Sequence, residues 1–305
     1  REVSLRQADA ERLAASGDLG GYVRADDLTS VVTINLNAGD VTANGTGSYG
    51  VFGIIGTDVG ASASGLLGIP VRTIGNDGAV ARINITDGVS VFGGTGDGAG
   101  IILQGAGRMT LNNAGSVVHR GDATGGAVVL GRLNTWNTIL GSQPTPTQFA
   151  LSLIDSVNSG TIAGGSGRGI WVQSGSIENF VNSGTVRGGT GAITSSGRGQ
   201  VTNVASGTID GAVVLSGANS VLTNSGLVRL SGPGAVASTV NGDWMQSAGR
   251  LELGLDDTLS VAGNMTLAGE LGLTLGTPSS TRIINVGGDL SIDALLDVTG
   301  DAGFG

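Results

Sequence analysis

The chain has 305 residues, of which 58 are Gly, 13% are charged and 3% are aromatic, and its net charge is −9. The negative charge excludes a basic nucleic-acid-binding surface, and the lack of a Gly-X-Y period excludes collagen. Because the chain has no Cys, disulfides and thiolate metal sites are excluded as well. The hydrophobic fraction of 39% is too high for a disordered tail and sufficient for a folded core.

Residues 1–28 differ in composition from the rest of the chain and are predicted to be an N-terminal cap or leader segment. Ser4 to Gln7 match a capping box, which predicts a short helix ending near Ser16 and Gly17. Such a segment would cover the open strand edges at the first coil of a solenoid. The alternative is a polar leader without fixed structure.

A short unit recurs along the chain after residue 28: a small residue, Gly, a polar residue and an aliphatic residue. From Gly160 onward the marker Gly recurs in steps of 24, 23, 19, 23, 20 and 19 residues. The earlier steps of 49, 27 and 45 residues fit either double periods or single periods with insertions. Between the markers, short runs alternate apolar and polar residues, and Gly, Asn, Ser and Asp separate the runs, which predicts short strands and turns.

Two or three short strands in a period near 20 residues are typical of one coil of a parallel β-helix. A leucine-rich repeat would need a Leu frame in register, and a propeller blade would need about 40 residues. We therefore predict an all-β, right-handed parallel β-helix of roughly twelve coils, with repeats over residues 29–241.

The turn of each coil is predicted at Asn and Gly, which both tolerate positive φ. Equivalent positions in stacked coils lie about 4.8 Å apart, so we expect the Asn amides to hydrogen-bond from coil to coil. The same stacking places Val186 in an aliphatic core ladder. The predicted structural turn positions are Asn158, Gly160, Asn182, Gly184, Asn224 and Gly226.

Residues 131–150 interrupt the period and form the candidate interaction loop. They contain Trp136, Pro144, Pro146 and Phe149, residue types that are rare elsewhere in the chain. Insertions in solenoids often form a binding face; the alternative is a loop that only packs over a neighbouring coil. A smaller insertion is predicted at residues 60–73.

The residues of the chain do not predict a catalytic centre. A Ser–His–Asp triad would have to use His119, the one His, which we expect to be exposed beside a turn. Acidic residues are scattered through the middle coils, without the carboxylate pair that a glycosidase needs. The sequence GGTGDG at residues 93–98 resembles a calcium-binding repeat but occurs once. We expect no catalytic residues, no metal and no cofactor.

Arg120, Gly121 and Asp122 form an RGD tripeptide directly after His119, in a predicted turn. Such tripeptides serve as integrin ligands when they lie on a loop. They also arise by chance in a chain rich in Gly and Asp, so this is a weak candidate for adhesion.

Residues 244–275 resemble the end of the passenger domain of Gram-negative autotransporters, the type V secretion family. The resemblance implies a β-helical stalk at the bacterial surface or released from it. It implies that residues 242–305 are an autochaperone region that folds first, and that membrane attachment would need a translocator barrel not present in this chain. The matching residues are Gly249, Leu251, Leu253, Asp257, Leu259, Val261, Gly263, Leu267, Gly269, Leu271 and Leu275.

Two functions remain for such a scaffold. The first is a non-enzymatic, adhesive or structural stalk at the cell surface or outside the cell. It would self-associate into oligomers or end-to-end filaments through its open strand edges. It would also bind a host or cell-surface ligand. The alternative is a polysaccharide lyase or hydrolase on the same scaffold.

Overall fold

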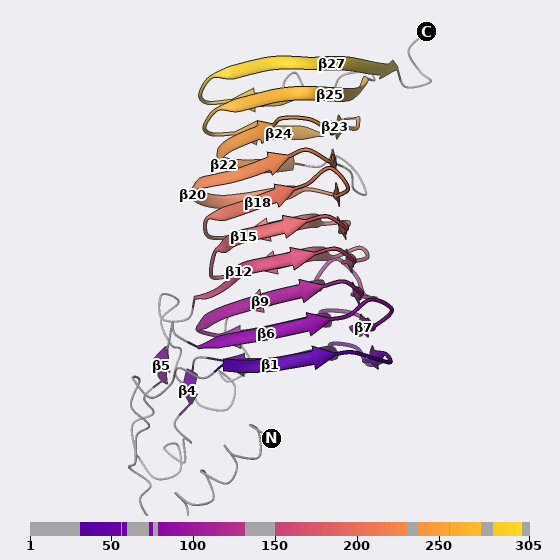
Figure 1. The fold of residues 1–305 in the computed structure, drawn as a ribbon, viewed down its shortest axis with the longest axis vertical. Coiled ribbons are helices and arrows are strands. Elements are labelled where there is room, and N and C mark those ends of the chain that lie inside the picture. The colour runs from indigo at the N-terminus through magenta and orange to yellow at the C-terminus, as the bar shows by residue number, and fades with distance from the viewer. Residues whose placement is uncertain are drawn as a thin grey trace, which may run out of the picture.

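The computed structural model describes residues 31–55, 57–59, 73–75, 79–131, 150–230, 237–255, 257–275 and 283–300. Over these residues the chain is an all-β parallel β-helix. Its strands stack into a rod, with β1 at one end and β27 at the other (Figure 1). The predicted cap or leader at residues 1–28 lies outside the described residues.

Each coil places its strands in three columns that run along the rod. The first column holds β1 (Val31–Leu36), β6 (Val80–Ile85), β9 (Gly107–Asn113), β12 (Leu151–Asn158), β15 (Ile177–Asn182) and β18 (Gly199–Asn203). The second holds β2 (Val41–Thr42), β7 (Ser90–Phe92), β10 (Ser116–Val118), β13 (Thr161–Ala163), β16 (Thr185–Arg187), β19 (Thr208–Asp210), β21 (Leu227–Leu230) and β23 (Arg250–Leu253). The third holds β3 (Tyr49–Ile55), β8 (Ala99–Gly105), β11 (Gly126–Gly131), β14 (Arg168–Val172), β17 (Gly191–Ser195), β24 (Thr258–Val261) and β26 (Ile284–Val286).

Four longer strands pass from one column to the next. β20 (Val213–Asn224) and β22 (Ala237–Gln246) pair first in the third column and then in the first. β25 (Met265–Leu275) pairs with both β22 and β23, and β27 (Leu290–Gly300) runs alongside β25 over its whole length. The one antiparallel pair described, β4 (Thr57–Val59) with β5 (Thr73–Gly75), lies beside the rod.

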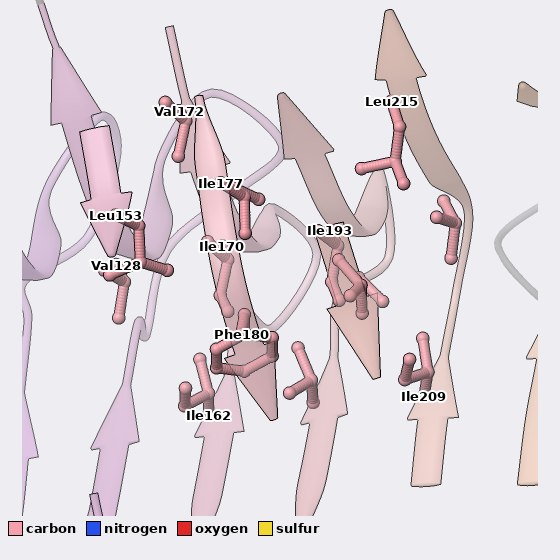
Figure 2. Packing of buried hydrophobic residues seen from close by; sticks show 14 of the residues in the cluster. Val128, Leu153, Ile162, Ile170, Val172, Ile177, Phe180, Ile193, Ile209 and Leu215 are labelled. Carbon is pink, nitrogen blue, oxygen red and sulfur yellow. The ribbon is translucent and has the colours of Figure 1, made fainter. Parts of the chain in front are cut away.

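Inward side chains form continuous aliphatic ladders, because parallel in-register strands stack like residues on like. One ladder contains Val186 as predicted and runs through Ile162, Val186, Ile209, Val228, Leu251 and Leu271. Every member is buried. In Figure 2 the labelled side chains converge from the strands of successive coils into one core. Burying an aliphatic side chain of this size stabilises the fold by about 1.5–3 kcal/mol.

The long early steps of the repeat are single coils with insertions. Asn35 and Asn84 are neighbours in adjacent coils although 49 residues separate them, and Asn113 and Asn158 are neighbours across 45 residues. The first insertion includes β4 and β5, and the second includes residues 132–149. The rod therefore has fewer coils over the described residues than the roughly twelve expected.

Three of the predicted turn glycines are required by close approach between coils. Gly160, Gly184 and Gly226 lie directly over the turn of the coil below, and a Cβ built on Gly184 would overlap the carbonyl oxygen of Gly160. None of these three has a positive φ, so the lack of a side chain, and not the freedom of the backbone, explains Gly here. Positive φ does occur at four other marker glycines, Gly39, Gly88, Gly249 and Gly269, and at Asp155 and Asn179 in the bends of β12 and β15.

Candidate functional site

The predicted amide ladder is present and lies inside the rod. Asn158 and Asn182 are the last residues of β12 and β15, both are fully buried, and Asn158 Nδ2 donates to Asn182 Oδ1 at 2.7 Å. The same amide also donates to the backbone oxygens of Gly160 and Thr185. The asparagines therefore lie at the ends of strands, just before the turn, whereas the glycines lie in the turn itself. The whole ladder runs through Asn113, Asn158, Asn182, Asn203, Asn224 and Gln246.

His119 is buried, which corrects the expectation of an exposed side chain. Its exposed fraction is 1%, its Nε2 lies 3.3 Å from the carbonyl oxygen of Asp122, and its Nδ1 has no partner. Gly121 and Gly125 make this possible, because a Cβ on either residue would collide with the imidazole ring. The alternation of inward and outward side chains in β10 could have indicated an inward His119, two residues after the buried Val117.

The RGD tripeptide lies in an exposed turn, and both of its charged side chains already have partners. The Arg120 guanidinium lies over the Phe92 ring, 4.0 Å from the centroid. The Asp122 carboxylate accepts hydrogen bonds from the hydroxyl and the backbone N–H of Thr124, at 2.6 and 3.0 Å. These hydrogen bonds lower the pKa of Asp122. Both hydrogen bonds from Thr124 go to Oδ1 of Asp122, so the tripeptide stays a weak candidate for adhesion.

Several carboxylates of the described residues bind side-chain amides or guanidinium groups. Asp155 accepts a hydrogen bond from Asn179 Nδ2 of the next coil at 2.9 Å. Its neighbour at the equivalent position of that coil is therefore an amide and not a second acid. Near the C-terminal end, Glu252 binds Arg229 and Arg250 at 2.6 Å each, and Arg250 also binds Glu270 and Asp297. Over the described ranges no group of three or more His, Asp or Glu side chains is placed to hold a metal ion.

A hollow of about 460 Å³ opens on the outer face of the third column, beside Trp171. No motif in the sequence indicates it, because the hollow depends on which coil positions stack on Trp171. Residues 132–149 of the candidate interaction loop lie outside the described residues, so the structure does not place Trp136, Pro144, Pro146 or Phe149.

Both ends of the described rod present open strands. In β27 the side chains of Leu290, Ile292, Leu296 and Val298 stack in register on the inward positions Met265, Leu267, Leu271 and Leu273 of β25. Their exposed fractions are 50, 56, 56 and 48%. At the other end, β1 pairs only with β6 among the described residues, and its inward Ile34 and Leu36 are only partly buried.

In the described part of the chain, no helix has the length and apolar character needed to cross a bilayer. No protein-family model, curated protein or solved structure matches the chain.

Proposed function

We propose that this protein is a non-enzymatic structural rod that joins further copies of itself end to end. The observation that carries the proposal is the apolar end at β27, where residues in core register are half exposed. A parallel strand edge offers a full row of backbone donors and acceptors to an added strand. These four aliphatic side chains are already about half buried, so completing the burial of each would contribute roughly half of the 1.5–3 kcal/mol that burial from full exposure contributes.

The geometry of the two ends favours a head-to-tail contact. The described strand pairings of the rod are parallel, so β27 of one copy against β1 of the next would continue the same pairing and the same core where residues 1–28 leave the edge of β1 free. A contact between two different surfaces repeats without closing and produces filaments. A contact between two β27 ends would be symmetric and would stop at a dimer.

Sedimentation of the full chain over a concentration series tests this proposal, with electron microscopy to measure rod length. We expect rods longer than one copy at high concentration. Ile292→Lys and Leu296→Lys place charges on the apolar end and should shift the chain to monomers. Met245→Lys is the matched control, since Met245 is also exposed, at 47%, but lies on the side of the rod. A chain that stays monomeric throughout, or that is unaffected by the β27 substitutions, would overturn the proposal.

We further propose that the rod is displayed on, or released from, the surface of a Gram-negative cell. The support is the resemblance of residues 244–275 to the end of autotransporter passenger domains. Protease treatment of intact producing cells tests this location: a surface rod is digested or shed, while a chain that stays intact until the cells are lysed contradicts it.

The alternative of a polysaccharide-acting enzyme needs two carboxylates on one groove. The described residues that line the hollow beside Trp171 are Trp, Val, Gln, Thr and Ser. This lining supports binding in preference to hydrolysis.

A further inference from the structure

The hollow beside Trp171 arises because a large outward residue is succeeded by small ones in the next coils. Trp171 stacks on Thr194 in the adjacent coil, so the surface steps down from an indole ring to a methyl and a hydroxyl group. Beside it, Gln173 and Ser196 come directly after the ends of β14 and β17. The residues that line the hollow are Trp171, Val172, Gln173, Thr194, Ser195, Ser196 and Ser216.

The Trp171 ring is held in place by its neighbours. The Arg168 guanidinium lies over the ring at 4.2 Å from the centroid, and burial lowers the pKa of Arg168. The ring also packs against a small buried cluster of Ala99, Ile102 and Val129, of which Val129 is its neighbour in the preceding coil. A ligand that contacts the ring therefore orders few additional side chains, which favours affinity.

The lining combines one aromatic ring with uncharged polar groups. Gln173 offers an amide donor and acceptor, and Thr194, Ser196 and Ser216 carry hydroxyl groups that can both donate and accept. No charged side chain is among the described lining residues. A charged ligand would find no opposite charge in the lining itself, because the nearby Arg168 guanidinium is stacked on the Trp171 ring. A purely apolar ligand would leave the amide and hydroxyls without partners.

We infer that this hollow binds a neutral saccharide. Its C–H face contacts the part of the Trp171 ring that Arg168 does not cover, and its hydroxyls bond Gln173, Thr194, Ser196 and Ser216. The volume lies in the range of ordinary small-molecule sites, about 300–1,000 Å³. Because the hollow lies on the side of the rod and the open strands lie at its ends, the inference is independent of end-to-end assembly. A stack of such rods would present the site at regular intervals.

Titration calorimetry of the full chain tests the inference, with cellohexaose and chitohexaose as neutral probes and hexagalacturonate as the acidic probe. At least one neutral probe should bind, and Trp171→Ala should weaken it at least ten-fold. Trp171→Phe, which keeps an aromatic face, should weaken binding less than Trp171→Ala does. Met245→Ala is the matched control and should leave binding unchanged, because Met245 is exposed but lies away from the hollow.

A melting curve and a sedimentation run on each variant separate lost binding from lost folding or assembly. Thr194→Tyr, which fills the hollow and keeps Trp171, should also abolish binding. The inference is overturned if neither neutral probe binds, if hexagalacturonate binds as well as they do, or if folded Trp171→Ala and Thr194→Tyr bind like the unaltered chain.

Discussion

Asn113 donates its side-chain amide to Asn158 Oδ1 at 2.7 Å, while its own side-chain oxygen is buried without a partner. The reason is that the ladder of amides has a direction. Each amide nitrogen points to the next coil toward the C-terminus, and each oxygen accepts from the coil before. Asn113 is the first member, and the residue in register with it in the preceding coil is Ile85, which has nothing to donate.

The far end of the ladder is satisfied by the backbone. Gln246 accepts from Asn224 and donates to the carbonyl oxygens of Ala268 and Glu270 at 2.9 and 3.1 Å. Its longer side chain reaches these acceptors where the row of asparagines stops. The ladder therefore leaves one unsatisfied atom, at its first coil, among the described residues.

Asn182→Ala should destabilise the rod, because it breaks the row of amides in the middle. Asn158 would lose an acceptor and Asn203 a donor, both buried, and an unsatisfied buried polar group costs about 1–3 kcal/mol. We expect a loss of at least that size in the free energy of unfolding from denaturant melts. Asn84→Ala is the control: Asn84 belongs to an exposed amide row with Asn35 and Asn112, and its loss should cost less than about 0.5 kcal/mol. Equal losses in the two variants would contradict a special role for the buried row.

Ile85→Asn should extend the ladder by one coil. The new amide would donate to the unsatisfied oxygen of Asn113, and its own oxygen would face Leu36, which is only partly buried. Ile83→Asn introduces the same change at a fully buried position opposite Leu111, without such a partner. We expect Ile85→Asn to be less destabilising than Ile83→Asn by about 1–3 kcal/mol, the value of satisfying a buried polar atom. Chemical denaturation of the two variants measures the difference, and a difference near zero would show that the Asn113 oxygen is satisfied in solution.

The sequence predicted the ladder but only half of its members, and the spacing explains why. Asn158, Asn182 and Asn224 stand two residues before a marker Gly, whereas Asn203 stands four before Gly207 and Gln246 three before Gly249. A search for Asn at a fixed distance before the marker Gly misses those ladder residues that are followed by a longer turn. Asn113, two before Gly115, carried the full signal and could have been found.

The hollow could not be predicted from the sequence for a different reason. The pairing of Trp171 with Thr194 depends on the register between coils, and turns of variable length change that register. The repeat period predicted the fold because many residues along the chain follow it. A site that forms where one large residue lies beside small ones occurs only once, so it produces no periodic signal in the sequence.

Gly184→Ala should be strongly destabilising even though its backbone does not require Gly. The added methyl group would overlap the Gly160 carbonyl oxygen of the coil below, so the two coils must move apart along the core. Overpacking of this kind costs about 1–3 kcal/mol. Gly45→Ala provides the control, because a Cβ there would be in ordinary contact, 3.6 Å from the Ser48 hydroxyl. Thermal melts should show a clear loss for Gly184→Ala and little change for Gly45→Ala, and a stable Gly184→Ala rod would contradict the close stacking of the turns.

Glu252→Gln should destabilise the C-terminal coils in a way that depends on pH. Burial acts to raise the pKa of Glu252, but the hydrogen bonds and charges of Arg229 and Arg250 outweigh it and lower the pKa overall. A carboxyl group with a lowered pKa in the folded state stabilises the fold above its unfolded pKa, near 4.3, and this contribution disappears as the pH falls through the folded value.

The expected result is a loss of about 1 kcal/mol for Glu252→Gln at pH 7 and low salt, which shrinks below about pH 4. High salt should also reduce the loss, because the groups are partly exposed. Glu178→Gln, at an exposed position on β15, is the control and should change stability little at either pH. Denaturant melts at pH 7 and pH 3 measure both variants. A Glu252→Gln effect that is the same at the two pH values would show that the side chain acts through packing and not through its charge.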